Sequence, residues 1–172
     1  MRNRGVADTM SAALKGLEPL APSEQWRWFK ELPYEAEVAR YRSFASRLAS
    51  DSPPPFAIKG LWFGLSHPIY EGRTTLDAYV AGVDTYEPED DDWAAGAEWN
   101  PAGQELRSGI LSDVYDLGYR RGNLTSGADL VGLAYVCLVA REATLELGKQ
   151  LSDRIGVACG FDGGDPLHLG EL

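Results

Sequence analysis

Hydrophobic side chains recur at helical spacing in the first fifty residues of the chain. The strongest of these patterns predicts an amphipathic helix over Glu35–Ala49. Its apolar stripe consists of Val38, Tyr41, Ala45 and Leu48. Shorter helical patterns cover Thr9–Leu17 and Glu24–Leu32. The run Ser50–Pro55 contains three consecutive prolines and stops this region, because proline cannot donate a backbone hydrogen bond. We therefore predict a helical front over residues 1–52.

After the prolines the pattern changes to short runs rich in aliphatic and aromatic residues. Phe56–Leu65 and Thr74–Thr85 predict two neighbouring antiparallel strands, joined by a turn. Ile155–Cys159 predicts a third strand, and Leu167–Leu169 a short fourth strand after a Gly- and Asp-rich turn. These runs together predict a mostly antiparallel sheet.

Two further helices are expected between the second and third strands, over Gly103–Leu117 and Asp129–Leu151. Within the second helix, Leu130–Ala140 is apolar on nearly every side, which is typical of a helix buried in a core. A chain of 172 residues is the usual size of one domain. The sequence thus predicts a single α+β domain over residues 1–172, with N-terminal helices and a buried C-terminal core helix packed on a sheet.

Charge is distributed unevenly along the chain. The net charge is −10, and residues 51–105 alone hold eleven acidic and two basic side chains, a net charge of −9. So much negative charge repels nucleic acid and anionic lipid surfaces, so we expect neither as a partner. Only two cysteines occur, Cys137 and Cys159, and no apolar stretch of signal-peptide type follows Met1. We therefore expect a cytoplasmic protein.

The acidic surplus coincides with two tryptophans. The densest acidic stretch contains Glu87, Glu89, Asp90, Asp91 and Asp92, and Trp93 and Trp99 follow it. Aromatic rings framed by carboxylates suit recognition of a basic protein partner. The two rings can equally belong to the core, so both interpretations stay open for Trp93 and Trp99. The recognition hypothesis treats residues 84–99 as an exposed loop.

No catalytic motif supports an enzyme. The chain lacks a nucleophile elbow, a phosphate-binding loop, a dinucleotide fingerprint and a zinc-protease helix. Asp162, Asp165 and His168 lie close together in sequence, so a small metal-dependent hydrolase is the alternative function. The same residues are also typical of a tight turn between two strands. Asp90–Asp92 lack the ligand spacing of a calcium loop, and we expect no metal and no cofactor.

Four short motifs carry a resemblance to known proteins. They are Gly60-Leu61-Trp62-Phe63-Gly64, Tyr79-Val80-Ala81-Gly82, Asp92-Trp93-Ala94 and Gly160-Phe161-Asp162-Gly163-Gly164-Asp165. Over residues 56–172 the chain resembles uncharacterised bacterial α+β proteins, some of which look like immunity proteins of polymorphic toxin systems. The resemblance implies a cytosolic protein that binds and blocks a toxin and catalyses nothing. We therefore expect a binding protein for a basic partner, as a monomer, a homodimer or a subunit of a larger assembly.

Overall fold

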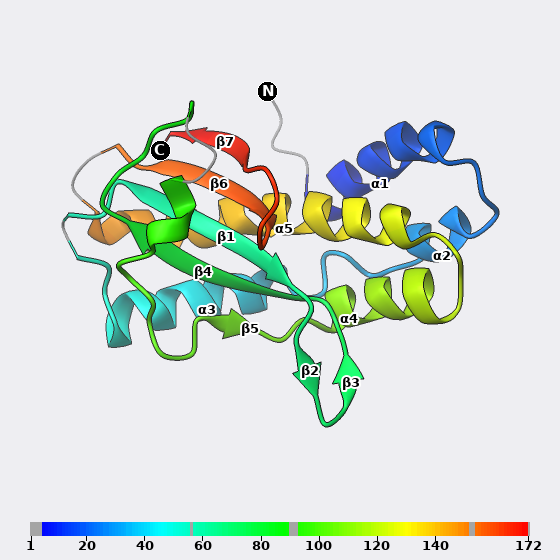
Figure 1. Ribbon diagram of the computed structural model, residues 1–172, viewed down its shortest axis with the longest axis horizontal. Coiled ribbons are helices and arrows are strands. Elements are labelled where there is room, and N and C mark those ends of the chain that lie inside the picture. The colour runs from blue at the N-terminus through cyan, green and yellow to red at the C-terminus, as the bar shows by residue number, and fades with distance from the viewer. Residues whose placement is uncertain (1–4, 56, 90–92, 152–153, 172) are drawn as a thin grey trace.

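The computed structural model describes residues 5–55, 57–89, 93–151 and 154–171. Its main helices are α1 (Val6–Leu17), α2 (Trp26–Lys30), α3 (Val38–Asp51), α4 (Gly109–Tyr115) and α5 (Thr125–Leu147). Its strands are β1 (Gly60–Ser66), β2 (Ile69–Tyr70), β3 (Arg73–Thr74), β4 (Asp77–Val83), β5 (Glu105–Leu106), β6 (Gly156–Phe161) and β7 (Leu167–Glu171). Helices cover one side of the main sheet, and β2 and β3 form a separate hairpin that projects below it (Figure 1). The predicted α+β class is confirmed.

The main sheet has the strand order β5-β4-β1-β6-β7. Three of its pairings are antiparallel, whereas β1 and β6 are parallel and start level with each other at Gly60 and Gly156. The parallel pairing follows from α5, which carries the chain back across the sheet before β6 begins. The expected strands over Ile155–Cys159 and Leu167–Leu169 are present as β6 and β7.

Helix α5 is the central helix of the fold. It packs against α1, α3 and α4 as well as against β1 and β6, and this explains why its sequence is apolar on nearly every side. Val136 is fully buried, while Leu133 and Cys137 are half-buried and pack against the core. The predicted core helix is therefore confirmed, although it begins at Thr125 and ends at Leu147.

The helical front belongs to the same hydrophobic core as the sheet. Met10, Trp26 and Leu48 are buried in one cluster with residues of the sheet and of α5. The segment predicted as a helix over Gly103–Leu117 is divided: it forms β5 first, and helix α4 starts after Ser108. The reason is local, because Ser108 Oγ accepts a hydrogen bond from Leu111 N at 3.1 Å and caps the helix there.

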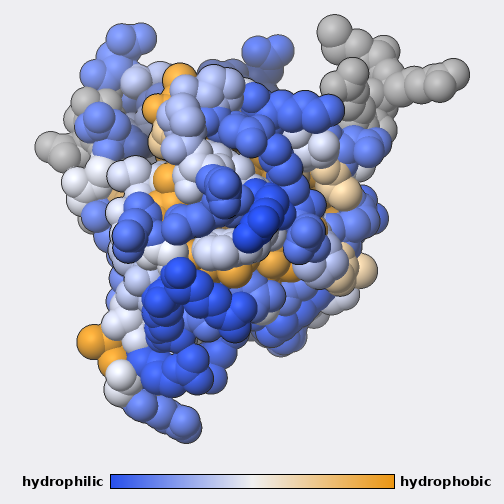
Figure 2. Space-filling view, turned by 90° about the vertical axis from the view of Figure 1, so that its right-hand side faces the viewer, coloured by the Kyte–Doolittle hydropathy of each residue, from blue (hydrophilic) through white to orange (hydrophobic). Residues whose placement is uncertain are grey.

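The surface is mostly hydrophilic on the face shown in Figure 2, where hydrophobic residues are visible in small patches. Within the described part of the chain, none of the helices has the length and apolar character needed to cross a bilayer.

Candidate functional site

The acidic segment predicted as a recognition loop leaves the sheet at the end of β4. Asp84, Glu87 and Glu89 are all exposed. In Figure 1 the chain after β4 crosses in front of the sheet, on the side opposite α5. Asp90, Asp91 and Asp92, which were predicted to belong to the same loop, lie outside the described residues.

Tyr86 attaches the start of this segment to the sheet. Its ring occupies the space above Gly156, where a Cβ atom would stand 2.2 Å from the ring. Its hydroxyl lies 3.2 Å from Nδ1 of His168 on β7. Burial, followed by the negative charge of Glu171, raises the pKa of Tyr86. Glu87 and Glu89 therefore follow closely after Tyr86, which is packed on the sheet.

Trp93 attaches the chain to the sheet again, beyond the acidic residues. It opens the short 3-10 turn η2 (Trp93–Gly96) and is only 5% exposed. Its ring stands edge-on to Trp62 and Tyr86, with centroid separations of 6.5 and 5.0 Å. A Cβ atom on Gly60 would lie 2.5 Å from this ring. Of the two interpretations left open for Trp93, the structure therefore agrees with the core residue and not with a residue of an exposed loop.

Trp99 is also buried, at 5% exposure, but on the other side of the sheet. Its Nε1 donates a hydrogen bond to the backbone oxygen of Ser52 at 3.0 Å. Its backbone pairs with Gly82 of β4. Trp99 therefore joins the end of α3 to the sheet, and here too the structure agrees with the core interpretation. Neither tryptophan is presented to a partner in this structure.

An aromatic layer covers the sheet face opposite α5. We use this name for Trp62, Tyr79, Tyr86, Trp93 and His168. Four of these rings lie over glycines of β1 and β6, where any Cβ atom would collide with them: Trp93 over Gly60, Tyr79 over Gly64, Tyr86 over Gly156 and Trp62 over Gly160. The glycines give the rings room to lie close to the backbone. In each strand the two glycines are four positions apart and therefore lie on the same face. This spacing was the signal in the sequence, but the rings that cover the glycines come from distant positions.

Strand β7 borders the aromatic layer and forms one edge of the sheet. Its inner side pairs with β6, and no strand of the described chain pairs with its outer side. Leu167 is 49% exposed and Leu169 is 39% exposed, so this edge strand presents apolar side chains at the surface. Sequence reasoning located this strand but did not assign it a function.

The alternative hydrolase residues have other partners. Asp162 accepts a hydrogen bond from the Tyr79 hydroxyl, and burial together with this bond raises the pKa of Tyr79 to about 12. His168 belongs to the aromatic layer through Tyr86 and Trp93, and Asp165 is exposed in the turn. Among the residues with described positions, no three His, Cys, Asp or Glu side chains are grouped to hold a metal ion. The absence of bound metal in the protein stays a prediction, which elemental analysis can check.

No protein-family model, curated protein or solved structure matches this chain.

Proposed function

We propose that this chain is a non-enzymatic, cytoplasmic binding protein of the immunity type, which recognises a basic protein partner such as a toxin domain. The contact surface combines the exposed acidic residues Asp84, Glu87 and Glu89 with the neighbouring edge strand β7. We call this the acidic edge. The observation that carries the proposal is that exposed carboxylates lie on either side of Tyr86, which packs on the sheet beside β7, whose outer side pairs with no described strand.

Tyr86 and Trp93 attach the chain to the sheet before and after the acidic residues. Tyr86 is packed over Gly156 and Trp93 over Gly60, so both ends of the segment are fixed to the same face of the sheet. A contact surface that is ordered before binding loses less conformational entropy when the partner arrives. This gives Trp93 a supporting role, because its ring is buried on the sheet and makes no contact with the partner.

Tyr86 also brings the acidic segment next to β7, because its hydroxyl reaches His168 on that strand. The open edge of β7 offers backbone donors and acceptors to an extended segment of the partner. Leu167 and Leu169 supply exposed apolar area beside it. Hydrogen bonds and apolar contact at β7 would provide affinity, while the carboxylates would attract the partner.

Capture of the partner from a lysate of the native host tests this proposal. The parent chain and a D84N/E87Q/E89Q variant are used as baits at low ionic strength, and bound proteins are identified by mass spectrometry. The proposal predicts a basic protein that the parent retains and the variant loses. A partner that both baits retain equally, or an acidic partner, would contradict recognition through the acidic edge. The double variant E24Q/E31Q removes two exposed carboxylates near α2 and serves as the control.

A further inference from the structure

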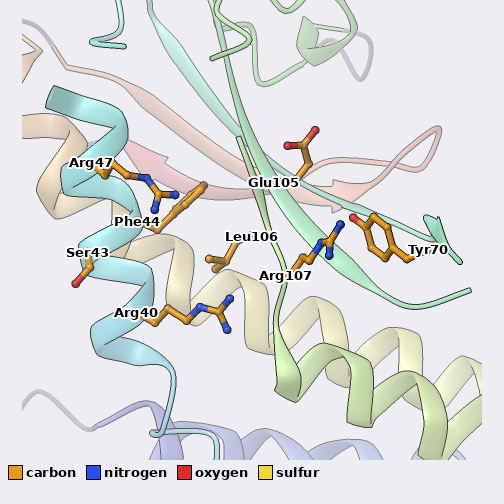
Figure 3. A pocket seen from close by; sticks show the side chains of 8 residues that line it. All are labelled: Arg40, Ser43, Phe44, Arg47, Tyr70, Glu105, Leu106 and Arg107. Atoms are coloured by element: carbon orange, nitrogen blue, oxygen red, sulfur yellow. The ribbon is translucent and has the colours of Figure 1, made fainter. Parts of the chain in front are cut away.

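A pocket of about 550 Å³ opens between helix α3 and the chain around strand β5. It is lined by Arg40, Ser43, Phe44, Arg47, Tyr70, Glu105, Leu106 and Arg107 (Figure 3). The volume lies within the range of pockets that bind small organic molecules. Its residues come from three segments of the chain that are 23 and 35 positions apart, so no local sequence pattern marks the pocket.

Positive charge dominates this pocket, in contrast to the protein as a whole. Arg40 and Arg47 are seven positions apart on α3, so they share one helix face about 10 Å apart along the axis. Figure 3 shows both extending from α3 toward the β5 segment, and Arg107 on the far side of β5, beside Tyr70. Glu105 is the one lining carboxylate, and it is turned away from α3. A positively charged hollow in a protein of net charge −10 would concentrate anions locally.

Aromatic rings hold two of the three guanidinium groups in place. The Arg107 guanidinium carbon lies 4.1 Å from the centre of the Tyr70 ring, and that of Arg47 lies 5.8 Å from the Phe44 ring. Such contacts use the face of the guanidinium and leave its N–H edge available for an oxyanion. Within the described residues, neither arginine has a carboxylate within 4 Å.

Arg40 also keeps donors for a ligand, although it contacts Glu37 at 3.2 Å. The Glu37 carboxylate additionally accepts hydrogen bonds from Ser108 Oγ at 2.5 Å and Gly109 N at 2.9 Å. Glu37 is therefore engaged mainly at the start of α4, where it complements the backbone N–H groups. A guanidinium has five N–H donors, and the structure gives Arg40 one bond to Glu37.

We propose that this pocket binds a small phosphorylated organic molecule with two separated anionic groups. Phosphate is favoured over carboxylate because a phosphate ester has three acceptor oxygens and up to two negative charges for the guanidinium groups. Two anionic groups are favoured because the lining arginines are separated, with Arg40 and Arg47 on α3 and Arg107 just after β5. This site is separate from the acidic edge, and it does not depend on the function proposed there.

Calorimetric titration of the full chain at low ionic strength tests the assignment with three probes. Fructose 1,6-bisphosphate has two separated phosphates, inorganic phosphate has one, and adipate has two separated carboxylates. We expect the bisphosphate to bind at least about tenfold more tightly than either of the others. Absence of bisphosphate binding, or equal binding of adipate, would overturn the proposal.

Substitutions locate the binding. R47Q changes an exposed side chain and is expected to fold, and R40Q and R107Q remove the other two cations. Each variant should weaken bisphosphate binding at least about fivefold, since each removes a charge-assisted contact. R27Q, on exposed α2 surface, is the matched control and should bind like the parent. If R47Q and the parent bound the bisphosphate equally, the ligand would lie elsewhere and the proposal would be contradicted. This outcome decides the test even if R107Q does not fold.

Discussion

The ring of Trp93 occupies the position that a side chain on Gly60 would need. A Cβ atom on Gly60 would stand 2.5 Å from ring carbon Cζ3 of Trp93 and 3.0 Å from Val83 Cγ2. The glycine and the tryptophan therefore depend on each other. Gly60 lets the ring lie on the sheet, and the ring fixes the end of the acidic segment.

Substitution G60A should displace Trp93 and destabilise the fold. Forcing a methyl group into a packed site typically costs about 1–3 kcal/mol, so the free energy of unfolding should fall by that amount. Urea unfolding of the parent and variant measures the change. G16A is the matched control, because nothing lies within 4 Å of a Cβ atom there. If G60A unfolded at the same urea concentration as the parent, the close packing of this pair would be wrong.

Removal of the buried tryptophans should also affect the fold directly. W93A and W99A should each lower the free energy of unfolding by about 3–5 kcal/mol, as is typical of large-to-small changes in a core. W99F keeps most of the buried ring area but loses the hydrogen bond to Ser52 O. Loss of this bond should lower the free energy of unfolding by about 1 kcal/mol, in addition to the smaller effect of the lost ring area. Thermal unfolding followed by tryptophan fluorescence measures these effects. A W93A chain as stable as the parent would return Trp93 to the recognition surface.

Local sequence patterns predicted those features of the fold that depend on a single segment. Periodicity located the helix at Val38–Asp51 and the core helix, because burial of one face leaves its mark in the segment itself. The parallel pairing of β1 with β6 could not be read in this way. It depends on the route of the chain through α5, and about ninety residues separate the two strands.

The candidate site was less predictable for the same reason. Glu87 and Glu89 are exposed, as the acidic composition suggested. The burial of Trp93 depends on Gly60 and Tyr86, and that of Trp99 on the end of α3 near Ser52. A loop-like sequence gives no sign of such distant partners. The arginine pocket was missed because its cations are spread over α3 and the β5 segment.

The buried carboxyl group of Asp77 should make the free energy of unfolding depend on pH. It is only 3% exposed, and burial raises its pKa, although its Oδ1 accepts a hydrogen bond from Ser108 N. A carboxyl whose pKa is raised by folding stabilises the fold while protonated and loses this contribution as pH rises through the folded-state pKa. D77N keeps the acceptor oxygen but cannot ionise.

We therefore expect D77N to gain stability relative to the parent as pH rises from about 3 to about 7. Urea unfolding of both chains across this range gives the difference. D113N, which changes an exposed aspartate, should show a much smaller pH-dependent difference. A D77N difference that stays constant over the range would show that Asp77 is not penalised by burial.

The association rate of the captured partner tests the central proposal most directly. E87Q/E89Q should lower the association rate constant about threefold or more and flatten its dependence on salt, because long-range attraction governs the encounter of charged surfaces. Dissociation and thermal unfolding should change little, since both side chains are exposed. E24Q/E31Q, with the same change of net charge at α2, should associate nearly as fast as the parent. If E87Q/E89Q and E24Q/E31Q slowed association equally, net charge alone would govern the encounter and the acidic edge would not be the recognition surface.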